Sequence, residues 1–176
     1  PAGIQVNGAT FLNASRTTLS TGNPILANGN LSGYQVNQGQ ISVNGQGLNT
    51  QGSDYTDLLA RAVKVNAGIW ANNLAITTGA NNINATNDNI TPNAATGTAP
   101  TIAIDTSALG GMYAGKITLI GTEKGVGVNN AGQIAASAGN VTIDANGMLS
   151  NSGTINSNGA ENATQIKSTQ LANTGS

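Results

Sequence analysis

The 176-residue sequence contains no cysteine and no histidine. Without cysteine the chain has no disulfide framework, thiolate nucleophile, iron–sulfur cluster or thiolate zinc site. Without histidine it lacks the most common general base and metal ligand, and with it Ser-His-Asp and Cys-His catalysis. The sequence therefore predicts no catalytic residues, no metal and no cofactor.

Charged and aromatic residues are also scarce, at 7% and 3% of the chain, whereas a typical soluble domain is about 25% charged. The six basic residues are scattered, so they cannot form the phosphate-neutralising stripe of a nucleic-acid-binding protein. No window approaches the roughly 18 to 20 apolar residues of a membrane span. The first residues lack the charged head and apolar run of a signal peptide, so we expect any export signal to lie outside this chain.

Glycine is abundant instead, with 24 residues, and Asn, Thr, Ser and Ala fill much of the remainder. Two structural classes suit this composition. The chain is either a disordered low-complexity segment, or a solenoid of short strands joined by tight turns. The spacing of the residues separates the two.

The C-terminal half contains an internal repeat. Residues 128–134 align with residues 149–155 at an offset of 21 (149 − 128), and residues 171–176 follow at an offset of 22 (171 − 149). Each copy has an aliphatic residue, Asn two positions later and Gly four positions later. The segments between copies alternate with the period of two that is typical of strands. A repeat of this length predicts a β-solenoid and disfavours disorder.

The first half shows the same alternation less regularly, and its strand-like segments are 39–45, 62–67, 74–77 and 101–105. We therefore predict an all-β fold, a parallel β-helix of at most about eight rungs spaced about 4.8 Å apart. Residues 79–100, rich in Asn and Pro, are the best candidate for a segment outside the β-helix. Residues 55–64 are ambiguous. They could form a short amphipathic helix capped by Asp54, although the alternation from Ala62 favours a turn leading into a strand.

Two glycine motifs resemble nucleotide sites. Residues 110–116 fit the first seven positions of a phosphate-binding loop, but Ile117 replaces the magnesium-ligating hydroxyl and a strand replaces the following helix. Residues 125–130 begin like a dinucleotide fingerprint, with Asn in place of the third Gly. We interpret the first motif as a turn with a solvated Lys116, and the second as a strand.

Enzymatic β-helices that act on polysaccharides need clustered carboxylates or a basic residue in a groove. Asp54, Asp57, Arg61 and Lys64 lie close enough in sequence to be considered, although a solvated charge patch is the simpler interpretation. A carbohydrate-active enzyme and a free-standing glycan-binding adhesive module are therefore the alternatives to a structural role. The seven acidic residues lack the spacing of a calcium loop.

Six blocks of the sequence resemble the secretion domain of filamentous-haemagglutinin-type exoproteins, in order and in spacing. They are residues 7–19, 45–49, 58–62, 66–71, 109–114 and 119–128. The resemblance assigns residues 1–125 to the C-terminal part of that secretion domain, and residues 126–176 to the first β-helix repeats of the filamentous region.

The resemblance implies a right-handed parallel β-helix with extra-helical hairpins or loops, from a large Gram-negative two-partner secretion exoprotein. Such proteins are adhesins or contact-dependent growth-inhibition toxins, and they are secreted or displayed on the cell surface. Their partner is an outer-membrane β-barrel transporter with periplasmic receptor domains, which recognises the secretion domain before it nucleates the β-helix outside the cell. A receptor on a host or target cell is a further expected partner.

The family's Asn-Pro-x-Gly-Ile motif is matched here only by Pro1, Gly3 and Ile4, with Ala2 at the variable position. The family's Asn-Pro-Asn-Leu motif and the cap that closes the β-helix are expected upstream of Pro1. We therefore expect Pro1, Gly3 and Ile4 to be the remnant of a secretion motif.

Overall fold

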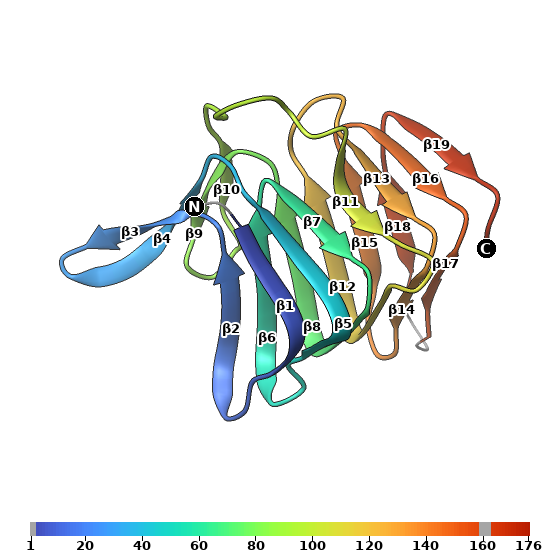
Figure 1. Ribbon diagram of the computed structural model, residues 1–176, viewed down its shortest axis with the longest axis horizontal. Helices are drawn as coiled ribbons and strands as arrows, with labels where there is room; N and C mark the ends of the chain where they lie inside the picture. The colour runs from blue at the N-terminus through green and yellow to red at the C-terminus, as the bar shows by residue number, and fades with distance from the viewer. Residues whose placement is uncertain (1–2, 159–162) are drawn as a thin grey trace.

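The computed structural model describes residues 3–158 and 163–176, which form strands, turns and loops. Parallel strands stack along the long axis of the molecule, and each turn of the chain adds a rung to the stack (Figure 1). Within these residues the strands complete six rungs and begin a seventh. The predicted parallel β-helix is confirmed, and the disordered alternative is wrong.

Each rung contributes to three stacks of parallel strands, here called A, B and C. Stack A consists of β1 (Gly3–Thr10), the start of β5 (Gln40–Asn49), β7 (Ala62–Val65), β11 (Ile102–Thr106), β13 (Gly127–Asn130), β16 (Met148–Asn151) and β19 (Gln170–Asn173). Stack B consists of the ends of β1 and β5, the first halves of β8 (Gly68–Thr78) and β12 (Gly111–Gly121), β14 (Gln133–Ala136) and β17 (Thr154–Ser157). Stack C consists of β2 (Ala14–Ser20), β6 (Ser53–Ala60), the second halves of β8 and β12, β15 (Val141–Ala145) and β18 (Thr164–Lys167).

The spacing of the sequence repeat equals the number of residues between paired positions in the last rungs. Val128 pairs with Leu149, and Leu149 pairs with Leu171, which are the predicted offsets of 21 and 22. Two earlier rungs are much longer, because Gly3 pairs with Gln40 (40 − 3 = 37) and Val63 pairs with Ile104 (104 − 63 = 41). Each of these two rungs carries an insertion, which explains why the chain makes fewer rungs than its length allows.

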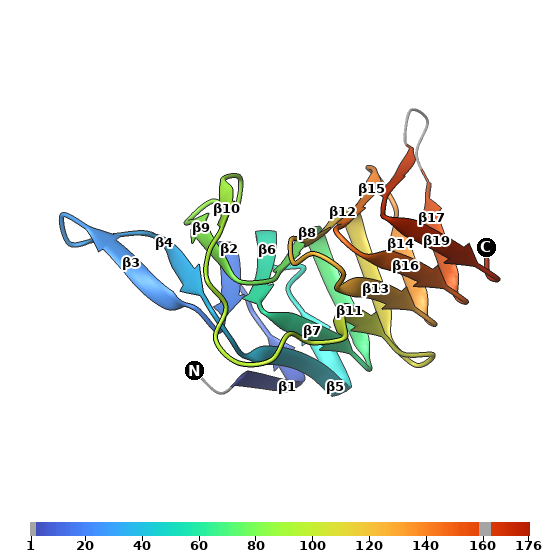
Figure 2. The same cartoon turned by 90° about the horizontal axis from the view of Figure 1, so that it is seen from above.

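The two insertions form a separate antiparallel sheet, in the order β10-β9-β4-β3. Its strands are β3 (Asn23–Ala27), β4 (Asn30–Val36), β9 (Asn81–Asn84) and β10 (Ile90–Pro92). The β3–β4 hairpin projects from the N-terminal end of the β-helix (Figure 2). The predicted excursion over 79–100 is therefore confirmed. The family resemblance implies extra-helical hairpins, but the position of the hairpin over 23–36 was not predicted.

The helix considered over 55–64 is wrong, because this segment forms β6 and β7. Leu58 points into the β-helix core, while the adjacent Leu59 packs with Val36 and Ile83 beneath the extra-helical sheet. Two consecutive buried leucines break the period of two and imitate one face of an α-helix. The second apolar layer therefore explains the ambiguity.

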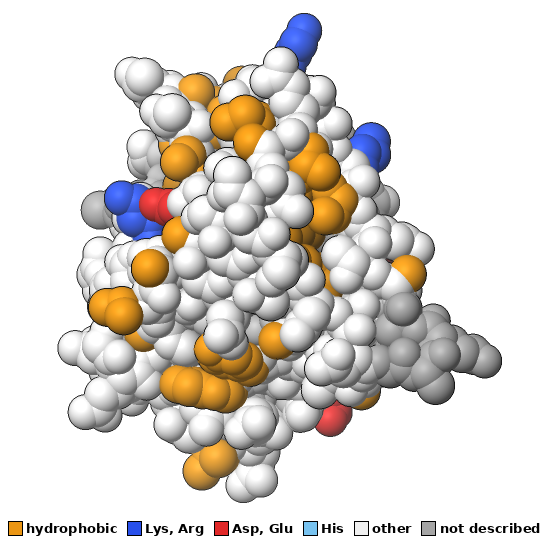
Figure 3. Space-filling model, turned by 90° about the vertical axis from the view of Figure 1, so that its right-hand side faces the viewer, with side chains coloured by type: hydrophobic (Ala, Val, Ile, Leu, Met, Phe, Trp, Pro, Cys, Tyr) orange, Lys and Arg blue, Asp and Glu red, His pale blue; other side chains and the backbone are white. Residues whose placement is uncertain are grey.

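Aliphatic side chains fill the interior of the β-helix, where Ile76, Ile104 and Ile134 are fully buried. The same columns reach the last strands of the stacks, β18 and β19, where Ile166 and Leu171 are 40% and 57% exposed. Figure 3 shows the resulting apolar surface at this end of the β-helix.

The Asn and Gly of the repeat hold the corner between stacks A and B. The Nδ2 of Asn130 donates to the Oδ1 of Asn151, and the Nδ2 of Asn151 donates to the Oδ1 of Asn173, both at 2.8 Å. A Cβ at Gly153 would lie 2.0 Å from the carbonyl oxygen of Gly132 in the preceding rung, so only glycine fits. The corner is therefore a side-chain amide ladder beside a close backbone contact.

We expect Asn151→Ala to lower the free energy of unfolding by about 1–3 kcal/mol, because it removes the amide that accepts from the buried Asn130 and donates to Asn173, and so interrupts the ladder. Urea unfolding followed by circular dichroism measures this. The matched control is Asn156→Ala, at an exposed position of β17, which should change stability by less than about 0.5 kcal/mol. Equal unfolding midpoints for the two variants would contradict a stabilising ladder.

Candidate functional site: the hairpin groove

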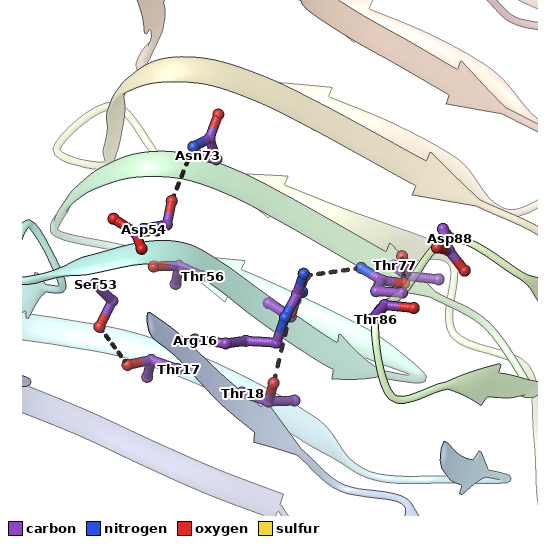
Figure 4. Close-up of polar contacts among 12 residues, drawn as sticks. Arg16, Thr17, Thr18, Ser53, Asp54, Thr56, Asn73, Thr77, Thr86 and Asp88 are labelled. Carbon is purple, nitrogen blue, oxygen red and sulfur yellow. Dashed lines mark hydrogen bonds and ion pairs between the residues drawn. The ribbon is translucent and has the colours of Figure 1, made fainter. Parts of the chain in front are cut away.

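A groove of about 470 Å³ lies on the outer face of stack C, beside the turn that joins β9 to β10. We call it the hairpin groove. Strands β2, β6 and β8 supply one side with Arg16, Asp57 and Asn73, and the turn supplies Asn87 and Asp88. Figure 4 shows these strands lying side by side, with Arg16 reaching across them.

Asp57 is the centre of this groove and is 2% exposed. Its carboxylate forms an ion pair with the Arg16 guanidinium and accepts hydrogen bonds from Asn87 Nδ2 at 3.1 Å and Thr18 Oγ1 at 3.5 Å. The Arg16 guanidinium also lies over the ring of Tyr55, 4.7 Å from its centroid. Asp57 therefore connects the first two rungs to the β9–β10 turn.

The β9–β10 turn is held by its own polar side chains. Asn84 Oδ1 accepts hydrogen bonds from the backbone N–H groups of Asp88 and Asn89, both at 3.0 Å. Hydrogen bonds from the side chains of Asn84 and Thr86 hold the pKa of the exposed Asp88 below its ordinary value. Asn87 has a φ of 54°, a left-handed conformation that Asn tolerates, and its Oδ1 accepts from Thr77 Oγ1 at 3.0 Å.

Arg61 makes a second clamp at the opposite end of β6. It forms an ion pair with Glu123 at 3.0 Å and donates to the backbone oxygens of Thr96 and Gly97 at 2.6 and 3.2 Å. Arg61 is 6% exposed, so these contacts replace nearly all of its hydration. This clamp attaches the loop after β10 to the body of the β-helix.

The structure does not bring together the four charged residues considered for catalysis. Asp57 and Arg61 belong to the two separate clamps, while Lys64 is exposed on stack A, a different face from the stack C position of Asp57. Asp54 is exposed at the start of β6. The two buried charges, Asp57 and Arg61, each already have partners in the fold.

The two nucleotide-like motifs are structural, as their context indicated. The interpretation of the first motif as a turn is wrong for residues 111–116, which form the first part of β12, whereas Lys116 is exposed as expected. A Cβ at Gly110 would lie 2.0 Å from the carbonyl oxygen of Val65, so this glycine is required by close backbone packing. In the second motif, residues 127–130 form β13.

The residues predicted to be a secretion-motif remnant lie at the start of stack A. Gly3 and Ile4 open β1 and pair with Gln40 and Ile41, and Ile4 packs against the core. Pro1 lies outside the described residues.

Among residues 3–158 and 163–176, no three His, Cys, Asp or Glu side chains gather as a metal site. Over the same residues no helix is long and apolar enough to span a membrane.

The partners in the two clamps, Arg16, Asn87 and Glu123, could not be identified from the sequence. Each lies 30 or more residues from the residue it contacts. Local spacing carries no signal for such contacts. The one usable signal is the scarcity of charge, since each isolated charge in a polar chain is a candidate for a specific ion pair.

Comparisons with known proteins place this chain among secretion domains. The sequence model of the TPS secretion domain matches residues 1–157. Toxin CdiA of Yersinia pestis is 59% identical over 158 residues, 89% of this chain, and tRNA nuclease CdiA-2 of Burkholderia pseudomallei (strain 1026b) is 54% identical over 156 residues, 88% of this chain. The chain spans 5% of the length of each of these relatives.

The crystal structure of the filamentous hemagglutinin secretion domain has the same fold. It superposes with a TM-score of 0.70 at 30% identity, over 97% of this chain and 64% of that chain.

We expect Asp57→Ala to lower the free energy of unfolding by about 1–3 kcal/mol, because Arg16 and Asn87 lose their acceptor in a largely buried contact. Urea unfolding measures the loss. Asp54→Ala, at an exposed position of the same strand, is the matched control and should stay within about 0.5 kcal/mol of the parent chain. If both variants unfold at the same urea concentration, Asp57 is not a structural clamp.

Proposed function

The chain belongs to the family of TPS secretion domains, the non-catalytic secretion segments of two-partner secretion exoproteins, and from this premise we propose how its β-helix serves export. Proteins of this family are secreted or displayed on the cell surface by way of the periplasm, so the predicted localisation is confirmed. The proposal has three parts, which concern the transporter, the folding step and the larger polypeptide.

The first part is that the outer-membrane transporter, through its periplasmic receptor domains, recognises this chain before it folds. Gly3 and Ile4 of the motif remnant support this order. In the folded protein both residues are engaged by β5, and Ile4 packs on the core. A receptor that binds these two residues, together with Pro1, therefore binds them in the unfolded chain.

The second part is that the β-helix forms outside the cell and makes export irreversible. The observation that carries it is the pair of clamps on the first rungs, which connect β2 and β6 to the second insertion, whose strand β9 pairs with β4 of the first insertion. Later rungs need no such insertions, because each adds 21 or 22 residues in register with the rung before. The first rungs thus act as the template on which further rungs stack.

The third part concerns the whole polypeptide. The relatives that are 59% and 54% identical are named a toxin and a tRNA nuclease. We assign the larger protein to toxin delivery between cells in contact rather than to host adhesion, with a target-cell receptor as its further partner. The toxic activity belongs to another part of the polypeptide, and the present segment catalyses nothing. The division between residues 125 and 126 stays a prediction.

Secretion of the full exoprotein with its transporter tests the first two parts. We expect Ile76→Asp, which buries a charge between Leu58 and Leu119, to prevent β-helix formation. Export should then fall by at least about tenfold. Binding of the urea-unfolded chain to the isolated periplasmic receptor domains should stay unchanged, because that step precedes folding.

Ile25→Asp is the matched control, since Ile25 is 39% exposed on β3, and its export should equal that of the parent. Normal export of Ile76→Asp would overturn the folding step. A folded parent chain that binds the receptor domains more tightly than the unfolded chain would overturn recognition before folding.

A further inference from the structure

A second groove, of about 680 Å³, lies at the corner between stacks B and C. We call it the corner groove. Asn73 and Lys116 line both the corner groove and the hairpin groove, so the two depressions meet at these residues. We call the two adjoining grooves, which lie across the outer face of β8 and β12, the combined groove. Apart from the Asp57 clamp in its hairpin part, neither the secretion proposal nor the folding template uses it.

An aromatic ring lies at each end of the combined groove. Tyr55 is at the hairpin end, is 50% exposed, and has one face covered by the Arg16 guanidinium. Tyr113 is at the corner end and stacks on Trp70, with centroids 6.1 Å apart and an interplanar angle of 17°. Its hydroxyl donates to Gln133 Oε1 at 3.2 Å.

Glycines lie in the backbone beneath the Tyr113–Trp70 pair. A Cβ at Gly111 would lie 2.6 Å from the Tyr113 ring, and a Cβ at Gly68 would lie 2.4 Å from the Trp70 ring. The glycines therefore leave the space that the rings occupy. The result is a fixed aromatic platform beside the alanines that line the corner groove.

Side-chain amides and a cation lie between the two tyrosines. Asn72 Nδ2 donates to the backbone oxygens of Gln51 and Ser53, at 3.0 and 2.8 Å, and Asn73 Nδ2 donates to that of Asp54 at 2.8 Å. These bonds to the preceding rung fix both amides. Over the described residues neither Oδ1 accepts a hydrogen bond, so each remains an acceptor for a ligand, while the Lys116 ammonium is a donor.

The chemistry of the combined groove favours a sugar over a peptide. An extended peptide gains most of its affinity by pairing with a free strand edge, but β8 and β12 already pair with strands on both sides. The charges balance, since Arg16 is paired with Asp57, and Lys116 lies in the same groove as Asp88. Aromatic faces with convergent amides suit a ligand with apolar ring faces and many hydroxyl groups.

We propose that the combined groove binds a neutral linear oligosaccharide, with sugar rings against Tyr113 and Tyr55 and hydroxyl groups on Asn72, Asn73 and Lys116. A surface-displayed exoprotein meets such chains on neighbouring cells. The ligand contacts lie outside the core and the motif remnant, so sugar binding by the folded chain and export of the exoprotein are measured separately.

The test uses the folded chain and three probes of different linkage, namely cellohexaose, chitohexaose and maltohexaose. Trp70 is the single tryptophan of the sequence and stacks on Tyr113, so its fluorescence reports a ligand on that ring. We expect at least one hexaose to give a saturable change with a dissociation constant below about 1 mM, confirmed by calorimetry. Calorimetry should show binding at least about tenfold weaker for Tyr55→Ala and for Tyr113→Ala.

Lys116→Ala should also weaken binding, whereas its matched control Lys64→Ala, on stack A, should bind like the parent. Circular dichroism confirms that each variant is folded. If Tyr113→Ala is not folded, Tyr113→Phe takes its place, because it retains the ring. The proposal is overturned if no hexaose binds, or if binding survives the loss of both tyrosine rings. A six-residue Gly/Asn peptide that binds more tightly than every hexaose would also overturn it.

Discussion

Every rung of the β-helix depends on the parallel backbone hydrogen bonds that its strands make with the preceding rung. These bonds stack Val63, Ile104, Val128 and Leu149 in one column. A slip of one residue would turn the whole column outward, so the interior fixes the register of the ladder. The corners obey the same constraint, because the close approach of Gly153 to the carbonyl oxygen of Gly132 leaves no room for a side chain. A composition rich in glycine and asparagine, with few aromatics, follows from this geometry.

The few buried charged residues attach an insertion that does not pair with the backbone ladder of the β-helix. An insertion leaves the β-helix and loses the repeating backbone contacts, so it needs a specific contact to return. Asp57 supplies one through Asn87, and Arg61 supplies another through the backbone oxygens of Thr96 and Gly97. Both are buried on the outer surface beneath the segments they hold. In a chain with 7% charged residues, a buried ion pair therefore indicates an insertion rather than a catalytic site.

The regular rungs could be predicted because their contacts recur at a fixed spacing, as the pairing of Val128 with Leu149 shows. The irregular rungs could not be predicted in this way. All residues of β3 are exposed, so its sequence has no alternation that marks a strand. Strand β4 pairs with β9 across two rungs of intervening chain, β5 to β8, and nothing local in either strand identifies its partner. The combined groove was equally hidden, since its aromatics become neighbours of its amides only when β6, β8 and β12 stack.

The topology also fixes the order in which the strands can pair, if the chain becomes available for folding N-terminus first. Strand β4 has no partner beyond its own hairpin until β9 emerges, and the Arg61 clamp requires Glu123. The first four rungs therefore reach their final contacts only as a group, after residue 123 is available. From β13 onward each new strand finds a complete edge and pairs with it at once, within 21 or 22 residues. The insertions thus make the start of the β-helix slow and cooperative, and they leave every later rung a short, local addition.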